Sequence, residues 1–229
     1  MGSAVKKGKG NDMETNGKNQ GRSGLTMVEL LVVIAVIVLL LSIVVLGLAD
    51  PKRRVSRINC VSNLRMIELA LATWSADHSH FAPVQLSVTN GGTKELTTSG
   101  LAYLQFQVLS NELSVPKLLV CPADGMRISA ASFGKGILSN TNVSYFIGVD
   151  AEDLYPGGLP VGDRNLSLND IPVKPGLVSL STNSLVGWTT EMHNRQGNIG
   201  LADGSVQQLT SAKLRQALQW NGTNRWVVP

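Results

Sequence analysis

Hydrophobic residues are distributed unevenly along the chain and divide it into distinct parts. Residues 1–23 are rich in Gly, Lys, Asn and Ser, and Val5 is their single β-branched apolar residue. Such a segment buries too little apolar surface to offset the loss of chain entropy, so we expect it to be disordered. Residues 30–49 (LLVVIAVIVLLLSIVVLGLA) carry no charge. A helix of this length covers about 30 Å, the thickness of a bilayer hydrocarbon core. The pattern therefore predicts a membrane-spanning helix, with a buried core helix as the alternative.

After Pro51 the pattern becomes amphipathic. Apolar residues recur at spacings of three and four, at Ile58, Val61, Leu64, Ile67, Leu71 and Trp74. This period is typical of a helix with one buried face. We therefore expect a near-continuous helix from Thr26 to Trp74, roughly 75 Å long, with its first half in lipid and its second half packed on a globular domain.

From His78 onward the chain has the short apolar runs and turn signals of strands and loops. The expected elements are strands at 143–149 and 185–190, a hairpin formed by 198–202 and 205–209, and a helix at 212–220. Asp203-Gly204 joins the two strands of the hairpin and is a preferred pair for a type I′ turn. A long N-terminal helix followed by a small antiparallel sheet is an α+β arrangement.

The net charge of +4 arises from 20 Lys and Arg against 16 Asp and Glu. Residues 1–24 contain five basic and two acidic residues, so they account for +3 of this charge and the remainder of the chain carries +1. A nucleic-acid-binding domain needs cations spread over one face and is therefore not expected. Because there are two cysteines, a disulfide-dense scaffold is not expected either.

The residues at the start of the apolar run have a distinctive order. In the stretch from Ser23 to Leu30 (SGLTMVEL), Gly24 and Leu25 are followed by Thr, two apolar residues and Glu29. This arrangement resembles the processing signal of type IV prepilins and type II secretion pseudopilins. The resemblance implies a pilin-like fold, in which a long N-terminal transmembrane helix packs on a small antiparallel sheet. It also implies cleavage between Gly24 and Leu25 by a prepilin peptidase, and N-methylation of Leu25, where the family usually has Phe.

Glu29 is the acid of this motif, and two roles are open for it. In the family, the residue at this place faces the N-terminal amine of a neighbouring subunit, which implies that Glu29 sets the axial register of a filament. Opposite charges attract more strongly in a low-dielectric filament core than in water. Thr26-x-x-Glu29 is also the pattern of a capping box, which begins a helix and needs no further role.

A second resemblance lies near the C-terminal end. Nine residues separate His193 from Asp203-Gly204, as in the H-x9-DG segment of a large bacterial group of prepilin-like proteins. Three further stretches resemble that group, namely 60–65 (CVSNLR), 121–124 (CPAD) and 162–165 (GDRN). The group implies no established role for the segment. On the residues alone, His193 ends a strand and bonds to the hairpin, while Asp203 and Gly204 form the turn.

The sequence lacks familiar catalytic motifs. It contains no G-x-S-x-G nucleophile elbow, no G-x-x-x-x-G-K-[ST] phosphate loop and no H-E-x-x-H zinc motif, so we do not expect an enzyme. His78 and His80 are closely spaced, but two histidines fall short of the four ligands of a tight zinc site. No cofactor is expected, except that calcium, which some pseudopilins hold, is an open alternative. Oxygen ligands for calcium would come from a loop-rich stretch that holds Asp150, Asp153, Asp163 and Asp170.

Two states are open for the cysteines, Cys60 and Cys121. A disulfide between them would tie the long helix to the domain and close a loop of about 60 residues, worth roughly 4 kcal/mol in the chain-entropy model. A free Cys60 buried on the helix is the alternative. Because no C-x-x-C occurs, a zinc ribbon or a thioredoxin-like site is not expected.

These observations together predict a structural subunit of a type IV pilus or a type II secretion pseudopilus. The expected parts are a cleaved leader (1–24), a transmembrane and filament-core helix (25–49), its amphipathic continuation (50–77) and a globular domain (78–229). We expect a single-pass inner-membrane protein with a periplasmic C-terminal domain. Its expected partners are a prepilin peptidase, other pilin-like subunits and the inner membrane. The alternative is a membrane-anchored periplasmic domain in which His193 and Asp203 bind or act on a ligand.

Overall fold

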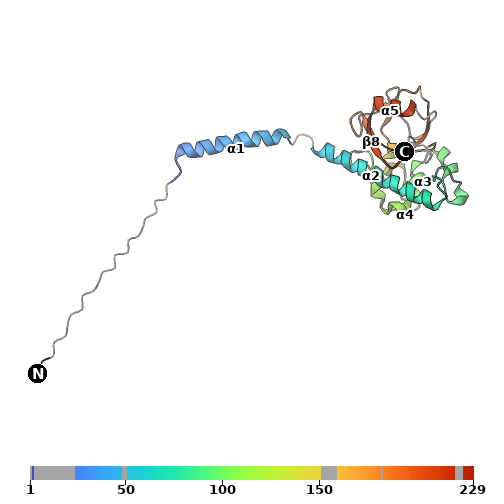
Figure 1. The fold of residues 1–229 in the computed structure, drawn as a ribbon, viewed down its shortest axis with the longest axis horizontal. Helices are drawn as coiled ribbons and strands as arrows, with labels where there is room; N and C mark the ends of the chain where they lie inside the picture. The colour runs from blue at the N-terminus through green and yellow to red at the C-terminus, as the bar shows by residue number, and fades with distance from the viewer. Residues whose placement is uncertain (1, 3–23, 48–50, 151–158, 182, 220–223) are drawn as a thin grey trace. The chain divides into compact units, whose positions relative to one another are not determined.

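The structure is a computed structural model that describes residues 2, 24–47, 51–150, 159–181, 183–219 and 224–229, without the side chains of 43–47, 51 and 52. The chain divides into two compact units, Met1–Ala49 and Asp50–Pro229. The described part of the first unit contains one helix, α1 (Met27–Gly47). All other helices and strands of the described residues belong to the second unit (Figure 1).

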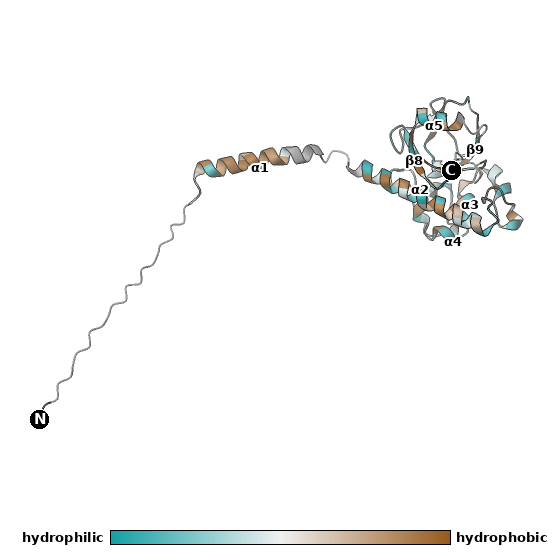
Figure 2. Cartoon of the chain, viewed as in Figure 1, coloured by the Kyte–Doolittle hydropathy of each residue, from teal (hydrophilic) through white to brown (hydrophobic). Residues whose placement is uncertain are grey.

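α1 presents an apolar surface to solvent along its described length. Every described side chain from Met27 to Ser42 is exposed, and the part of the helix that Figure 2 colours by hydropathy is mostly hydrophobic. Even so, none of the helices within the described residues is both long and apolar enough to cross a membrane. A span needs about 20 consecutive apolar residues, and the predicted run over 30–49 extends into residues that lie outside the description. The predictions of a transmembrane helix and of a single-pass inner-membrane location are therefore contradicted.

The prediction of one near-continuous helix from Thr26 to Trp74 is also wrong. Two helices are present, α1 and α2 (Pro51–Asp77), and they belong to different compact units. The amphipathic pattern of α2 is confirmed over most of its length, because Leu64, Ile67, Leu71 and Trp74 are buried. Ile58 is an exception at 59% exposed, since the helix becomes buried only from Cys60 onward.

The β-structure forms two antiparallel sheets. The larger has six strands in the order β5 (Gly176–Leu180), β9 (Asn224–Val228), β1 (Tyr145–Gly148), β2 (Val161–Asp163), β7 (Gln196–Gly200) and β8 (Val206–Thr210). The smaller has three strands in the order β4 (Ile171–Pro172), β3 (Leu166–Leu168) and β6 (Val186–Trp188). The predicted pilin-like fold, a long N-terminal helix on one small sheet, is therefore wrong. Several strands have only two or three residues, too few for alternation of polar and apolar residues to reveal them.

The remaining helices are short. They are α3 (Ala102–Gln107), α4 (Ser110–Leu113) and α5 (Ser211–Gln219), with 3₁₀ turns η1 (Val88–Asn90), η2 (Lys94–Ser99), η3 (Pro116–Leu119) and η4 (Asn140–Asn142). α5 starts one residue before the predicted 212–220, and the predicted strands at 143–149 and 185–190 appear as the shorter β1 and β6.

Both faces of the six-stranded sheet are buried at its central strands β1 and β2. Along β1, Tyr145 and Ile147 belong to the apolar cluster that includes the buried face of α2, whereas Phe146 belongs to a second cluster with Trp226 and Leu214. α2 contacts β2, β7 and β8 on its side of the sheet. Gly200 permits this close packing, because a Cβ placed there would lie 1.8 Å from Oε1 of Glu68 on α2.

The hairpin predicted around Asp203-Gly204 is confirmed, but its turn differs. β7 and β8 pair from Gln196↔Thr210 to Gly200↔Val206. Leu201 N donates to Ser205 O, and Gly204 N donates to Leu201 O. Gly204 has φ +79°, and no positive φ occurs at Asp203. The loop is therefore a three-residue turn with glycine in the left-handed position, because a type I′ turn requires positive φ at both central residues.

Candidate functional site

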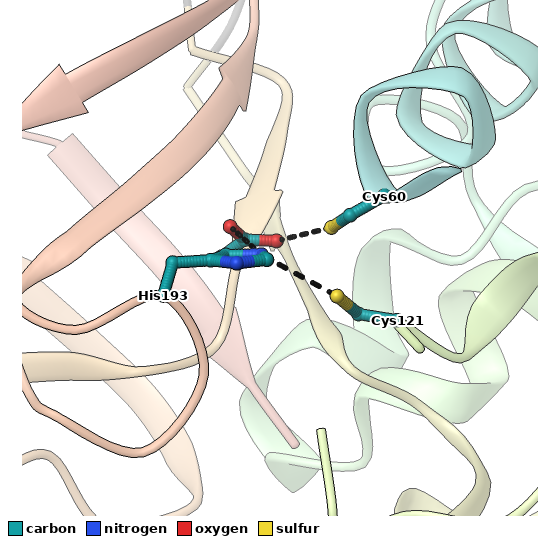
Figure 3. A group of neighbouring side chains, drawn as sticks. Cys60, Cys121 and His193 are labelled. Atoms are coloured by element: carbon teal, nitrogen blue, oxygen red, sulfur yellow. Dashed lines mark hydrogen bonds and ion pairs between the residues drawn. The ribbon is translucent and has the colours of Figure 1, made fainter. Parts of the chain in front are cut away.

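Four side chains with metal-ligand chemistry converge inside the second unit. They are Cys60 on α2, Cys121 after η3, Asp163 at the end of β2, and His193 in the turn before β7. One ligand atom from each residue lies within 4.8 Å of the other three, and all four residues are buried. Figure 3 shows the thiols of Cys60 and Cys121 directed toward the region of the His193 ring. We call this group the Cys60–Cys121–Asp163–His193 cluster.

Four different segments position these residues. Cys60 lies on the buried face of α2, and Asp163 is the last residue of β2, where it pairs with Tyr145 of β1. Asn194 and Arg195 directly follow His193 and have φ of 52° and 60°. These two left-handed residues turn the chain sharply between His193 and β7.

The contacts within the cluster are short. Cys60 Sγ donates to Asp163 Oδ1 at 3.1 Å and lies 3.4 Å from the Tyr145 hydroxyl. His193 Nε2 lies 3.4 Å from Cys121 Sγ and 3.3 Å from Asp163 Oδ2. The same nitrogen therefore faces both the second thiol and the carboxylate, which means that the donor atoms gather around one point.

Neighbouring groups hold two of the ligands in place. Asp163 Oδ2 accepts hydrogen bonds from the backbone N of Asn198 at 2.7 Å and from its Nδ2 at 2.9 Å. The carbonyl oxygen of His193 accepts a hydrogen bond of 2.8 Å from the Arg57 guanidinium. The residues at the cluster thus have fixed orientations, set by α2 and by β7.

Burial favours the uncharged forms of Cys60, Asp163 and His193. Desolvation raises the pKa of Asp163 to about 7, although hydrogen bonds from Cys60 and Asn198 oppose the shift. Desolvation also raises the pKa of the Cys60 thiol well above its usual range. The pKa of His193 falls to about 4, because the ring is desolvated and the Arg57 cation lies nearby. A cation at the centre reverses this preference, since it stabilises thiolates and the carboxylate.

An ion pair joins two of the stretches that carry the cluster. Arg164, next to Asp163, donates to Asp124 through Nε at 2.7 Å and through NH2 at 2.8 Å. The hydroxyl of Ser144 donates to Asp124 Oδ2 at 2.8 Å. The segment of Cys121 and the end of β2 are therefore tied together beside the cluster.

The other predicted site residues lie elsewhere. Asp150 follows β1 and accepts a hydrogen bond of 2.8 Å from Arg225 N, while Asp153 lies outside the described residues. Asp163 faces sulfur and nitrogen rather than an oxygen-rich calcium loop. Asp203 is exposed at the hairpin turn, where its Oδ1 accepts a bond from Ser205 N. The structure therefore does not bring Asp150 to Asp163.

His193 and Asp203, the pair of the alternative ligand-binding hypothesis, are also separated. His193 precedes β7 and is buried, whereas Asp203 follows the other end of that strand beside Gly204. His78 stacks on Trp74 with ring centroids 3.7 Å apart, and its Nδ1 lies 2.8 Å from the Trp74 carbonyl oxygen. The structure therefore does not bring His193 and Asp203 into a shared site.

The predicted processing segment lies at the start of α1. Gly24 and Leu25 are exposed and precede the helix. Glu29 Oε2 accepts hydrogen bonds of 2.8 Å from both N and Oγ1 of Thr26, and Glu29 N donates to Thr26 Oγ1 at 3.3 Å. The capping box predicted at this position is therefore formed.

The sequence singled out all four cluster residues but did not bring them together. Cys60 and Cys121 were paired as a candidate disulfide, and in the structure both thiols are free and buried. A signal was present, because each cluster residue lies in one of the four stretches of the second resemblance. Comparison of the chain with protein-family models, curated proteins and solved structures finds no match.

Proposed function

We propose that the chain is a structural subunit of the prepilin-like class, cut between Gly24 and Leu25 and then assembled with similar subunits through α1. One observation carries the proposal. From Met27 to Ser42, every side chain of α1 is exposed, and Glu29 is the single charged residue among them. A contiguous apolar surface of this kind marks a site of association with other molecules.

The start of α1 supports a role for Glu29 in that assembly. Both hydrogen bonds from Thr26 go to Oε2 of Glu29, while Oε1 accepts no hydrogen bond from the described residues. Cleavage after Gly24 creates an ammonium group on Leu25. In a bundle of α1 helices, the ammonium of one subunit and Glu29 of the next are opposite charges in an apolar setting, where pairing fixes the relative position of the helices.

Processing is the first step to test. The full chain is co-expressed with an active prepilin peptidase, and its intact mass and N-terminal sequence are determined. We expect a mature chain that begins at Leu25, with or without one added methyl group. Gly24→Leu is the matched variant, and we expect it to keep the leader because a bulky residue replaces glycine at the cleavage site.

A known prepilin expressed beside this chain serves as the control for peptidase activity. If that control is cut while this chain retains its leader, the proposal is wrong. If this chain is cut, assembly is examined by cross-linking of the mature subunits through cysteines introduced along α1.

A further inference from the structure

Two distances inside the Cys60–Cys121–Asp163–His193 cluster match the edges of a tetrahedral metal site, and all four donor atoms lie within 4.8 Å of one another. Zinc binds sulfur at about 2.3 Å and nitrogen or oxygen at about 2.0–2.2 Å, so the edges of its coordination tetrahedron are about 3.3–3.8 Å. Cys121 Sγ and His193 Nε2 are 3.4 Å apart, and His193 Nε2 and Asp163 Oδ2 are 3.3 Å apart. Small side-chain movements are therefore sufficient to place four donors around one ion.

The kinds of donor atom select the class of metal. Two thiolates and an imidazole are soft or borderline ligands, which favour zinc over calcium or magnesium, whose sites are built from oxygen. Four protein ligands complete a tetrahedron and leave no position for water or substrate. Such a closed, buried set is typical of structural zinc sites rather than catalytic ones.

On this basis, we propose that Cys60, Cys121, Asp163 and His193 bind one zinc ion that fastens α2 to the β-sheet. The inference goes beyond the proposed assembly function, and it concerns the second compact unit alone. Binding displaces the two thiol protons and the proton of any Asp163 carboxyl that is protonated, all of which pass to water, and the ion is then held by two thiolates, one carboxylate and a neutral imidazole. The centre carries one net negative charge, which the Arg57 guanidinium on the His193 carbonyl partly offsets.

The groups around the four ligands support this assignment. In metal sites, outer hydrogen bonds fix the orientation of the ligands. Here the backbone N and Nδ2 of Asn198 both donate to Asp163 Oδ2, and these two bonds fix the orientation of the carboxylate. Tyr145 Oη lies 3.4 Å from Cys60 Sγ and is placed to donate to a thiolate. An open hollow whose lining includes Arg57, Met192 and His193 lies on the His193 side of the cluster.

Two other roles for the cluster fit the geometry less well. A catalytic cysteine triad uses one histidine nitrogen for the thiol and the other for the acid, but here Nε2 faces both Cys121 and Asp163. Cys121 is also fully buried, which shields its thiol from a substrate. A Cys60–Cys121 disulfide would leave Asp163 and His193 buried beside an apolar bridge, without a thiol to bond.

The first experiment measures metal on the unmodified protein. The full chain is purified from cells grown with added zinc, and bound metals are quantified by inductively coupled plasma mass spectrometry. We expect about one zinc per chain. After removal of zinc, titration with Co²⁺ is expected to give thiolate-to-cobalt charge-transfer absorption and the intense visible bands of tetrahedral cobalt. This readout needs no variant and therefore does not depend on how a mutant folds.

Variants then identify the ligands. We expect His193→Ala and Cys121→Ser to lower the affinity for zinc at least tenfold. Asp163→Asn should lower this affinity by a smaller factor. His80→Ala and Asp203→Asn are matched controls, because both residues are exposed and lie outside the cluster, and they should keep full occupancy. Full occupancy in His193→Ala and Cys121→Ser would place the zinc elsewhere and overturn the proposal. So would a wild-type chain that takes up neither zinc nor cobalt after full reduction, or an octahedral cobalt spectrum without thiolate bands.

Discussion

Arg164 holds Asp124 through two parallel hydrogen bonds of 2.7 and 2.8 Å, and the Asp124 side chain is only 1% exposed. This bidentate pair joins the segment of Cys121 to the residue that follows Asp163. Charge-assisted pairs of this geometry are among the stronger polar interactions in proteins, and loss of one partner leaves the other charge buried.

We therefore expect Asp124→Asn to lower the free energy of unfolding by about 3–5 kcal/mol, because the Arg164 guanidinium then loses its buried carboxylate and keeps only the contact with the more exposed Glu191. Urea unfolding followed by tryptophan fluorescence measures the change. Asp77→Asn is the control, since Asp77 is exposed at the end of α2 and its substitution should stay within about 0.5 kcal/mol. Equal stability of the two variants would contradict a stabilising role for the pair.

The same carboxylate gives the stability a pH dependence at the acidic end. Burial alone would raise the pKa of Asp124, but the hydrogen bonds and charge of Arg164 outweigh it and hold that pKa below its usual value. Its contribution is fully present above the unfolded pKa of about 3.9 and is lost as the pH falls through the lower, folded value. Unfolding curves between neutral and strongly acidic pH should therefore fall less steeply for Asp124→Asn than for the wild type.

Removal of zinc should lower the melting temperature if the cluster binds the ion. At a free zinc concentration 100 times its dissociation constant, binding stabilises the folded state by about 2.7 kcal/mol. For a domain of this size, that corresponds to roughly 5–10 °C. Differential scanning calorimetry with and without a chelator measures the shift. His193→Ala should melt at the same temperature in both conditions, and a chelator effect that persists in this variant would point to another site.

Gly200 lies where α2 packs on β7, and even a methyl side chain at this position should destabilise the protein. A Cβ at this position would meet the carboxylate and Cγ of the buried Glu68, so we expect Gly200→Ala to destabilise the second unit by about 1–3 kcal/mol. Gly125→Ala is the matched control, because nothing lies within 4 Å of its Cβ position. Chemical denaturation of both variants tests the difference. If the two are equally stable, the close packing of α2 on β7 is not required.

Two substitutions separate the roles open for Glu29. Glu29→Gln keeps an acceptor for the capping box but removes the charge, so we expect processed subunits that assemble poorly. Thr26→Ala removes the cap and keeps the charge, so assembly should continue while α1 loses about 1 kcal/mol of helix stability. Cross-linking yield of the mature subunits measures assembly. If Glu29→Gln assembles normally, Glu29 has no role in assembly and serves only in the capping box.

Local patterns predicted the elements that one segment determines by itself. The period of α2 identified Leu64, Ile67, Leu71 and Trp74 as its buried face, because a helix on a sheet needs one apolar stripe. The hairpin from β7 to β8 was visible because Asp203-Gly204 is a strong turn signal. The predicted two-residue type I′ turn was wrong. The turn has three residues because strand pairing ends at Gly200↔Val206, and the turn signal does not determine where pairing ends.

The site required information that no local pattern holds. Asp163 and His193 meet because β2 pairs with β7, although β7 follows β2 by more than thirty residues in the chain, and Cys60 and Cys121 come from two other segments, α2 and the stretch after η3. β2 has three residues and β6 three, so their sequences carry no readable alternation. Asp163 was consequently grouped with acids of its own loop region rather than with the two thiols. The apolar run at 30–49 was interpreted by its hydropathy alone, which does not determine where a helix ends, and α1 ends at Gly47.

The order of the large sheet also constrains when it is completed during synthesis. β9 follows the other described strands of this sheet in the chain, yet it lies between β5 and β1 and pairs with both. Until Asn224–Val228 emerges, one edge of β1 and one edge of β5 are open, and among the described strands β5 has no other partner in the sheet. Nascent chains that stop before residue 224 therefore present two unpaired strand edges, so the final residues of this unit protect it against association with other incomplete chains.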